Sequence, residues 1–318
     1  MRLPLLKTTT AVVFLDDDER FLDTLSLLIP ERFPVSLFTH PAELDARLSR
    51  LDEDLAEEQR LLGAVVDGGS RGALRCALDY LAWTGSDRIP GVLVSDHAMP
   101  AESGVSVCAR HCHAFVLRRV LLTGVADAAL AIRAVNEGAI DAFLSKNTPC
   151  LVEHLVGMLH EQSLRALEIR GRRLAEGLSA CSEQLLSRPE IAAALTGRLS
   201  TMGLVAHVVV GDPLGVLGVS AEGQWIWVQI ETVQSLRDLA DCLHEMGVAP
   251  GTVQGVRECR ALPNVELAAV FDGLPPRLSP LQALAATEPE VFAAVFDLSA
   301  DGMALTVPAP LTLAVAGE

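Results

Sequence analysis

The first half of the chain alternates short apolar runs with stretches whose apolar residues recur at helical spacing. The apolar runs predict strands at 12–15, 35–38, 92–95, 119–122 and 140–144. The stretches between them predict helices at 18–29, from Pro41, at 104–115 and at 126–137. Repeated β-α units predict an α/β fold, a doubly wound five-stranded parallel sheet.

The second crossover is longer than one helix requires. Leucines continue at helical spacing from Leu44 to Leu62, and 73–83 predicts a helix that returns. The glycine-rich run 68–72 between them lacks the Lys and Ser/Thr ending of a phosphate-binding loop, so we interpret it as a turn. We therefore expect a helical hairpin inserted at about residues 47–88.

After Pro149 the pattern changes. Leucines at helical spacing over 151–174 predict a long helix that projects as a connecting or coiled-coil segment, and a second helical piece follows at 182–202. Further on, the pattern predicts strands at 206–210, 216–219 and 225–230 and a helix at 233–246. The predicted organisation is an α/β domain over 1–149, a helical linker over 150–202 and a smaller α+β domain over 203–318.

Composition narrows the function classes. Half of the 318 residues are hydrophobic, which indicates a globular protein. The formal charge of −16 argues against DNA binding as the function, since phosphate backbones demand clustered Lys and Arg. We interpret the basic run 170–173 as a solvated helix face. With no secretory segment and no apolar window long enough to span a membrane, we expect a cytoplasmic protein with reduced cysteines and no membrane partner.

Polar residues follow four of the predicted strands: Asp16-Asp17-Asp18, Asp96, Thr123 and Lys146. The carboxyl ends of parallel strands meet at one edge, where open α/β sheets place their chemistry. Clustered carboxylates repel one another and favour a hard divalent cation with oxygen ligands, which describes Mg²⁺. A hydroxyl and an amine beside such a cation are suited to holding a phosphoryl group.

Four motifs in this order resemble the receiver domain of two-component response regulators: Leu15–Glu19, Ser95–Pro100 with Gly104, Leu121–Gly124 and Phe143–Lys146. The resemblance covers about residues 9–150 and implies a flavodoxin-like receiver fold. It implies that Asp96 is the phosphoacceptor, that Thr123 and Lys146 contact the phosphoryl group, and that Phe143 is the switch aromatic. It also implies a Mg²⁺ site formed by Asp17, the Ala98 carbonyl, Asp96 and, through water, Asp16.

The sequence departs from the receiver pattern near Lys146. Asn147 follows it where receivers usually have Pro, so the sequence leaves open whether the peptide bond there is cis. The separation of Lys146 from Thr123 is slightly longer than usual and predicts a bulge in the last strand. Gly124 replaces the more frequent Ala, which leaves that loop looser. None of these departures removes a residue of the predicted chemistry.

A rival interpretation starts from Asp16. Residues 14–18 also resemble the Asp-x-Asp start of haloacid-dehalogenase-like phosphatases, with Asp16 as nucleophile and Asp18 as acid. Those enzymes need a further acidic pair after the lysine, and none follows Lys146. We favour Asp18 as the cap of the first helix.

Two further groups are interpreted as structural. Cys108, His111, Cys112 and His113 lie on one helix, but the sequence supplies no recognisable set of four zinc ligands. Trp225 and Trp227 alternate on a predicted strand, so both point to one face, and we expect them in the core.

No familiar output module follows the receiver-like part. We favour a response regulator of a phosphorelay that is phosphorylated by a sensor histidine kinase or phosphotransfer protein and acts by protein–protein contact rather than as an enzyme. A homodimer through the helix at 151–174 is expected. The alternative is an undescribed enzymatic or ligand-sensing C-terminal domain, for which Asp212, Glu231 and His244 are the candidate polar residues.

Overall fold

The computed structural model describes residues 3–84, 89–124, 128–271, 274–285 and 290–299, and every structural statement below concerns these residues. The chain divides into two compact units. The α/β unit holds Thr8–Glu58 and Ser86–Arg170. The α+β unit holds Met1–Lys7, Gln59–Gly85 and the described chain from Gly171 onwards.

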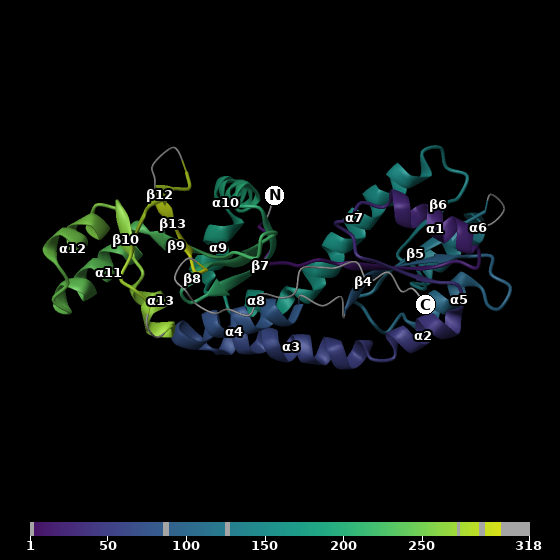
Figure 1. Ribbon diagram of the computed structural model, residues 1–318, viewed down its shortest axis with the longest axis horizontal. Coiled ribbons are helices and arrows are strands. Elements are labelled where there is room, and N and C mark those ends of the chain that lie inside the picture. Colours follow the sequence, from purple (N-terminus) through teal and green to yellow (C-terminus); the bar gives the residue numbers. More distant parts are fainter. Residues whose placement is uncertain (1–2, 85–88, 125–127, 272–273, 286–289, 300–318) are drawn as a thin grey trace. The chain divides into compact units, whose positions relative to one another are not determined.

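The α/β unit is built on a five-stranded parallel sheet with the order β3-β2-β4-β5-β6 (Figure 1). Its strands are β2 (Ala11–Leu15), β3 (Val35–Phe38), β4 (Pro90–Asp96), β5 (Arg118–Thr123) and β6 (Ala142–Ser145). The central strands β2 and β4 are buried along their whole length, as their unbroken apolar runs require. The predicted doubly wound, flavodoxin-like sheet is confirmed.

Five helices complete this unit: α1 (Glu19–Leu28), α2 (Pro41–Leu48), α5 (Gly104–Arg110), α6 (Ala128–Asn136) and α7 (Leu151–Arg170). Asp18 caps α1 by accepting hydrogen bonds from the backbone N–H groups of Arg20 and Phe21, which agrees with the predicted role. Pro41 is the first residue of α2, also as predicted.

The predicted helical hairpin consists of α3 (Leu51–Asp67) and α4 (Gly69–Thr84). The turn between them depends on glycine, since Gly69 has a φ of +57° and a Cβ on Gly68 would lie 2.6 Å from the backbone nitrogen of Ala73. The division between the units falls within α3, after Glu58, and α4 packs on strands of the α+β unit. The sequence pattern showed the helices but not the sheet that they pack against.

Helix α7 differs from the projecting segment that the sequence predicts. Leu155 and Leu159 are fully buried in the core of the α/β unit, together with Val94 and Leu122 of the sheet. The helix ends at Arg170 and therefore completes the α/β fold, so the expectation of a free coiled-coil segment is wrong. The boundary at 149 accordingly moves to the end of α7.

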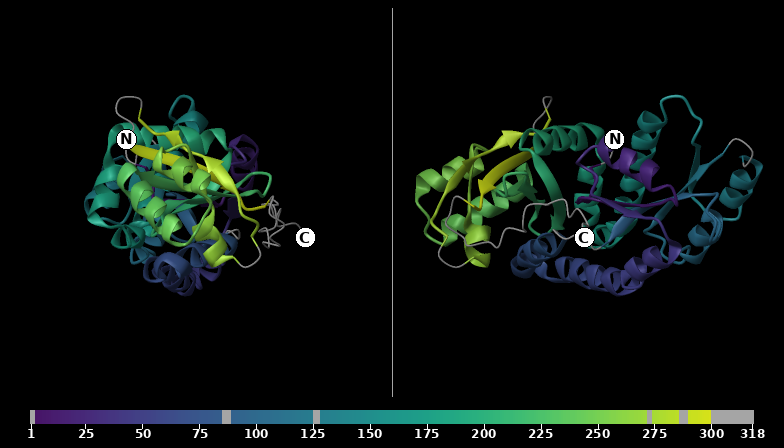
Figure 2. Two further views of the ribbon diagram at one scale, coloured as in Figure 1. Left: turned by 90° about the vertical axis from the view of Figure 1, so that its left-hand side faces the viewer. Right: turned by 45° about the vertical axis from the view of Figure 1, so that its right-hand side comes forward.

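The α+β unit contains a six-stranded antiparallel sheet with the order β1-β7-β8-β9-β13-β12 (Figure 2). Its strands are β1 (Leu6–Lys7), β7 (Leu204–Gly211), β8 (Leu214–Ser220), β9 (Trp225–Thr232), β12 (Gln282–Ala283) and β13 (Val291–Asp297). A separate pair joins β10 (Ala261–Pro263) to β11 (Leu278–Pro280). Trp225 and Trp227 are both buried, so their predicted place in the core is confirmed.

Besides the end of α3 and α4, the described helices of this unit are α8 (Arg172–Glu176), α9 (Ala180–Ser187), α10 (Pro189–Thr201), α11 (Val233–Glu245), α12 (Pro250–Arg257) and α13 (Val265–Val270). Leu185 of α9 and Ile191 of α10 are buried in one cluster with Val228 of the sheet. The stretch predicted as a linker over 150–202 is thus divided between the cores of the two units. The sequence ends in an apolar run at 305–316, which lies outside the described residues.

A search of the described helices finds none with the length and apolar character that crossing a bilayer requires.

Candidate functional site

Three carboxylates gather at the carboxyl end of the parallel sheet. Asp16 and Asp17 follow β2 and Asp96 ends β4, and one oxygen from each lies within 4.8 Å of the other two. Asp16 is 2% exposed and Asp96 5%, whereas Asp17 is open to solvent. The structure therefore brings together the three acids that the sequence placed at two separate strand ends.

Lys146 bridges two of these acids. Its Nζ lies 2.7 Å from Asp16 Oδ2 and 2.7 Å from Asp96 Oδ1, and 4.6 Å from the ring centre of Phe21. Its backbone N–H donates to the carbonyl of Thr123 at 2.9 Å. The amine is therefore held at the sheet edge between the two most buried carboxylates.

The strand before Lys146 is regular. Strands β5 and β6 pair in one register from Val120 opposite Ala142 to Thr123 opposite Ser145. The bulge predicted for the last strand is therefore absent from these paired residues. The peptide bond before Asn147, which the sequence left open, is not among the cis bonds of the described chain.

Burial sets the electrostatics of this cluster. It raises the pKa of Asp16 above its ordinary value, although the Lys146 ammonium and the Asp18 N–H act in the opposite direction. Burial also acts to lower the pKa of Lys146, but its hydrogen bonds to Asp16 and Asp96 and their charges raise the pKa above its usual value overall. The amine therefore stays charged at neutral pH, while the burial of the Asp16 carboxylate is not fully compensated.

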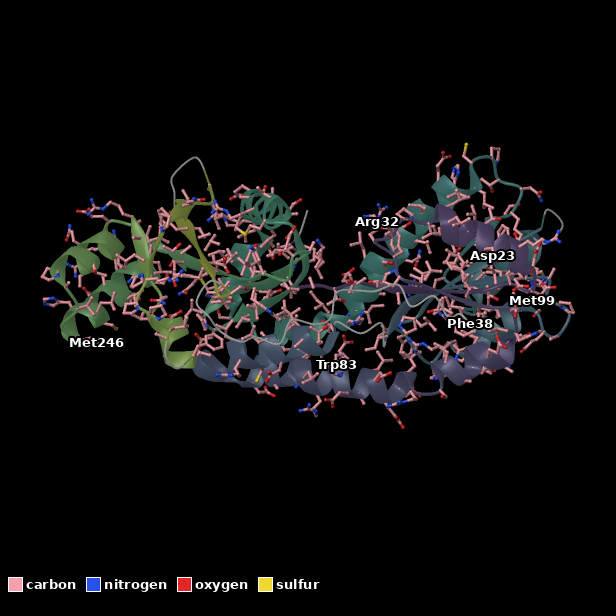
Figure 3. The ribbon with its side chains drawn as sticks, in the orientation of Figure 1. Asp23, Arg32, Phe38, Trp83, Met99 and Met246 are labelled. Carbon is pink, nitrogen blue, oxygen red and sulfur yellow. The ribbon has the colours of Figure 1, made fainter. Side chains whose placement is uncertain are left out.

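The loop after β4 fixes the orientation of Asp96. Asp96 Oδ2 accepts a hydrogen bond from the Ala98 N–H at 2.9 Å, and Met99, labelled in Figure 3, is buried in the same loop. A Cβ on Gly104 would lie 1.9 Å from the Asp96 carbonyl oxygen, so this position accepts only glycine without a shift of the backbone. The glycine noted in the sequence thus lets α5 begin directly against the site.

The remaining predicted residues lie on the neighbouring strands. Thr123 is 1% exposed at the end of β5, beside β4. Phe143 lies on β6 opposite Leu121 and is half-buried. Thr123 thus lies on the strand beside Asp96, and Phe143 lies on the strand that leads to Lys146.

The predicted helix over 104–115 ends at Arg110, so only Cys108 of the cysteine and histidine group lies on α5, and His111, Cys112 and His113 follow it. The group does not assemble as a metal site among the described residues. Cys108 is buried, and burial raises the pKa of its thiol to about 12. His111 Nε2 lies 2.9 Å from Asp45 Oδ1, which ties α5 to α2. The structural interpretation of this group is supported.

The basic run at 170–173 was expected on a solvated face. Arg170 instead is 3% exposed and pairs with Glu58, which is fully buried. The expectation is wrong for this residue because its ion partner lies far away in the sequence.

A second acidic group lies in the α+β unit. Gln229 Nε2 donates to Glu231 at 2.7 Å and to Glu266 at 2.6 Å, and Ser235 Oγ donates to the other oxygen of Glu231.

Asp212, another of the polar residues suggested by the sequence, accepts a hydrogen bond from the Ser70 hydroxyl. Of the polar residues suggested by the sequence, His244 is exposed on α11. Glu266 was missed because it stands as a single acid in a segment with no readable pattern.

Replacing Glu266 with glutamine is expected to stabilise the protein at pH 8 but not at pH 5. Burial, helped by the charges of Glu231 and Asp212, raises the pKa of Glu266 to about 7. A raised folded-state pKa gives stability that is present below the ordinary value of 4.5 and lost as the pH rises through about 7. Urea unfolding should show a gain on the order of 2 kcal/mol at pH 8. The exposed Glu245→Gln is the control, and an equal gain at both pH values would contradict the prediction.

No protein-family model and no curated protein sequence matches the chain. Among solved structures, the response regulator LqsR of Legionella pneumophila is similar over 93% of this chain and 90% of its own, with a TM-score of 0.68 and 20% identity. The signal receiver domain of an HD domain-containing protein from Pseudomonas fluorescens matches 54% of this chain and 99% of its own, with a TM-score of 0.38 and 19% identity. A CheY-like receiver domain protein from Methanospirillum hungatei matches 52% of this chain and 100% of its own, with a TM-score of 0.32 and 14% identity.

The α/β unit has the fold of a response-regulator receiver domain. The likeness to LqsR extends beyond it and covers nearly the whole chain, so the α+β unit also has a counterpart of known fold.

Proposed function

We propose that this protein is a phosphorelay response regulator whose Asp96 accepts a phosphoryl group in the presence of Mg²⁺. The observation that carries the proposal is the ammonium of Lys146 held 2.7 Å from both Asp16 and Asp96 at the carboxyl edge of the sheet. A structural ion pair with Lys146 would need only one acid. Here the lysine pairs with a strand-end aspartate that has two further acids beside it, and this arrangement supports the formation of an acyl phosphate.

The residues present fit a magnesium ion. Asp16, Asp17, Asp96 and the carbonyl of Ala98 would hold it with hard oxygen ligands. Burial raises the pKa of Asp16, and a bound cation would offset that cost of its charge. When bound, the ion would neutralise charge on the phosphoryl oxygens. The buried Asp96 carboxylate is aimed by the Ala98 N–H. One of its oxygens would attack the phosphorus atom of the donor, and the acyl phosphate would form as the bond from phosphorus to the donor's histidine nitrogen, or to acetate in acetyl phosphate, breaks.

The response would begin at the phosphoryl group. The added negative charge would draw the hydroxyl of Thr123 and the ammonium of Lys146 toward it. Lys146 would then exchange its contact with Asp16 for the new anion, and Phe143, on the strand that leads to Lys146, would follow. This local change can bias a two-state surface of the unit.

The donor is proposed to be a sensor histidine kinase or phosphotransfer protein, and the α+β unit is proposed to signal to a protein target, with homodimer formation as part of the response. A turnover enzyme of the phosphatase type is not favoured. Asp18, its required acid, has a side-chain oxygen committed to the Arg20 and Phe21 N–H groups as the cap of α1.

Intact-mass spectrometry tests the proposal. The protein is incubated with acetyl phosphate and Mg²⁺, or with acetyl phosphate and EDTA. A single phosphoryl adduct only with Mg²⁺ is the expected result. A folded protein that stays unmodified in both samples would refute phosphoacceptor function.

Mg²⁺ is expected to raise the thermal unfolding midpoint of the wild type and to leave that of Asp17→Asn unchanged. A ligand that binds only the folded state stabilises it by about 2.7 kcal/mol at one hundred times its Kd. Because Asp17 is exposed, its substitution should not alter the midpoint without metal. Differential scanning calorimetry measures both, and an equal Mg²⁺ effect in the two proteins would place the ion elsewhere.

A further inference from the structure

Glu58 of α3 and Arg170 of α7 form a buried ion pair in the α/β unit. Arg170 Nε lies 2.9 and 3.0 Å from the two Glu58 carboxylate oxygens, and Nη2 also contacts Oε1. Glu58 is 0% exposed and Arg170 3%. This is a bidentate, fully desolvated pair, whereas Arg165 and Glu161 on the outer side of α7 form an exposed one.

The stability of the fold does not by itself explain this pair. The free energy lost when both charges leave water offsets much of the attraction between them. Apolar side chains of similar volume often give the folded state equal stability. A bidentate pair also fixes the relative orientation of its two side chains, since the planar guanidinium donates hydrogen bonds to a carboxylate in one geometry. A pair of this kind fixes how two helices are aligned.

The position of the pair in the chain is informative. Glu58 and Arg170 are the residues at which α3 and α7 reach the end of the α/β unit, since the α+β unit resumes at Gln59 and at Gly171. Helix α3 is continuous across this division. The ion pair therefore joins two of the points at which the chain passes out of the α/β unit.

Helix α7 is attached along its length to the strands that carry the site. Leu155 and Leu159 lie in the core with the sheet, and Gln162 accepts a hydrogen bond from Arg118 of β5. At Gly91 of β4 a Cβ would lie 3.2 Å from the Cβ of Ala166, so the helix backbone approaches this strand closely. Strand β4 ends at Asp96, and α7 ends at Arg170.

We propose that the Glu58–Arg170 pair couples α7 to α3, so that a change at Asp96 reaches both chain crossings together and passes to the α+β unit. The inference rests on the proposed phosphorylation of Asp96. A shift of β4 and β5 on phosphorylation moves α7, Arg170 carries Glu58 with it, and α3 transmits the motion past Gln59.

Hydrogen–deuterium exchange with and without phosphorylation tests this coupling in the full chain. In the wild type, phosphorylation changes exchange in α3 beyond Glu58 and in α8 and α9. In Glu58→Gln the adduct at Asp96 forms to the same extent by intact mass, but these distant changes are lost. The exposed Glu161→Gln on α7 is the matched control and keeps them.

A second variant keeps the test decisive if Glu58→Gln fails to fold. Glu58→Leu combined with Arg170→Met replaces the pair by apolar groups that can pack, and the distant changes are again lost while the adduct remains. Distant changes of wild-type size in either folded variant would overturn the coupling alone. Absence of any adduct in the wild type would instead overturn the proposed function, and the coupling with it.

Discussion

Asp96→Asn is expected to abolish phosphorylation by acetyl phosphate and Mg²⁺. The amide keeps the shape of the side chain and its contact with the Ala98 N–H, but it is not a nucleophile toward phosphorus. The residual rate should be at least about 10³-fold lower, as expected when the nucleophile of a covalent step is removed. Intact-mass time courses of the two proteins measure this ratio directly.

Asp18→Asn is the matched control. Asparagine caps a helix as well as aspartate does, so α1 should be unaffected and phosphorylation should proceed at the wild-type rate. The same variant would eliminate the acid that the phosphatase interpretation requires. Loss of phosphoryl chemistry in Asp18→Asn with retention in Asp96→Asn would contradict our assignment of Asp96 and support the phosphatase interpretation, in which Asp18 is the acid.

Lys146→Met is expected to change two properties in opposite directions. Without the ammonium near Asp16 and Asp96, Mg²⁺ should bind more tightly, by about 1–2 kcal/mol or roughly tenfold, because a competing positive charge is gone. Phosphorylation should nevertheless become roughly 10²-fold slower, since a charge aimed at the phosphoryl oxygens is lost. Methionine keeps most of the side-chain volume, which limits the effect on folding.

Isothermal titration with Mg²⁺ and intact-mass kinetics separate the two effects of this variant. Lys7→Met removes the other half-buried lysine, which donates to the Leu204 carbonyl in the α+β unit, and serves as the control. Weaker Mg²⁺ binding with unchanged phosphorylation would show that Lys146 supports the acids structurally and does not face the phosphoryl group.

The receiver-like site could be predicted from sequence because each of its parts is local. Asp16 and Asp96 stand directly after apolar runs, and the topology of parallel strands brings such ends to one edge. Gly104 was marked by its spacing from Asp96, although only the structure shows that a Cβ there would strike the backbone. Asp18 was assigned as a cap from its place before the helix.

The parts that were missed depend on partners distant in sequence. Helix α7 has an apolar pattern that suits a coiled coil or a sheet surface equally, and only the packing of Leu155 and Leu159 decides. Glu58 and Arg170 are separated by 112 positions, so nothing near either residue marks the pair. Strand β1 has two residues and precedes the α/β unit, yet it pairs with β7. Local periodicity carries no information on any of these contacts.

The most direct measurement locates the phosphoryl group on the chain. Borohydride reduces an acyl phosphate on aspartate to the alcohol of homoserine, and peptide mass spectrometry then reads the modified position after treatment with acetyl phosphate and Mg²⁺. Homoserine at position 96, absent when EDTA replaces Mg²⁺, is the result that our account predicts. Homoserine at position 16 would contradict it and support the phosphatase interpretation, and an unmodified chain would contradict both.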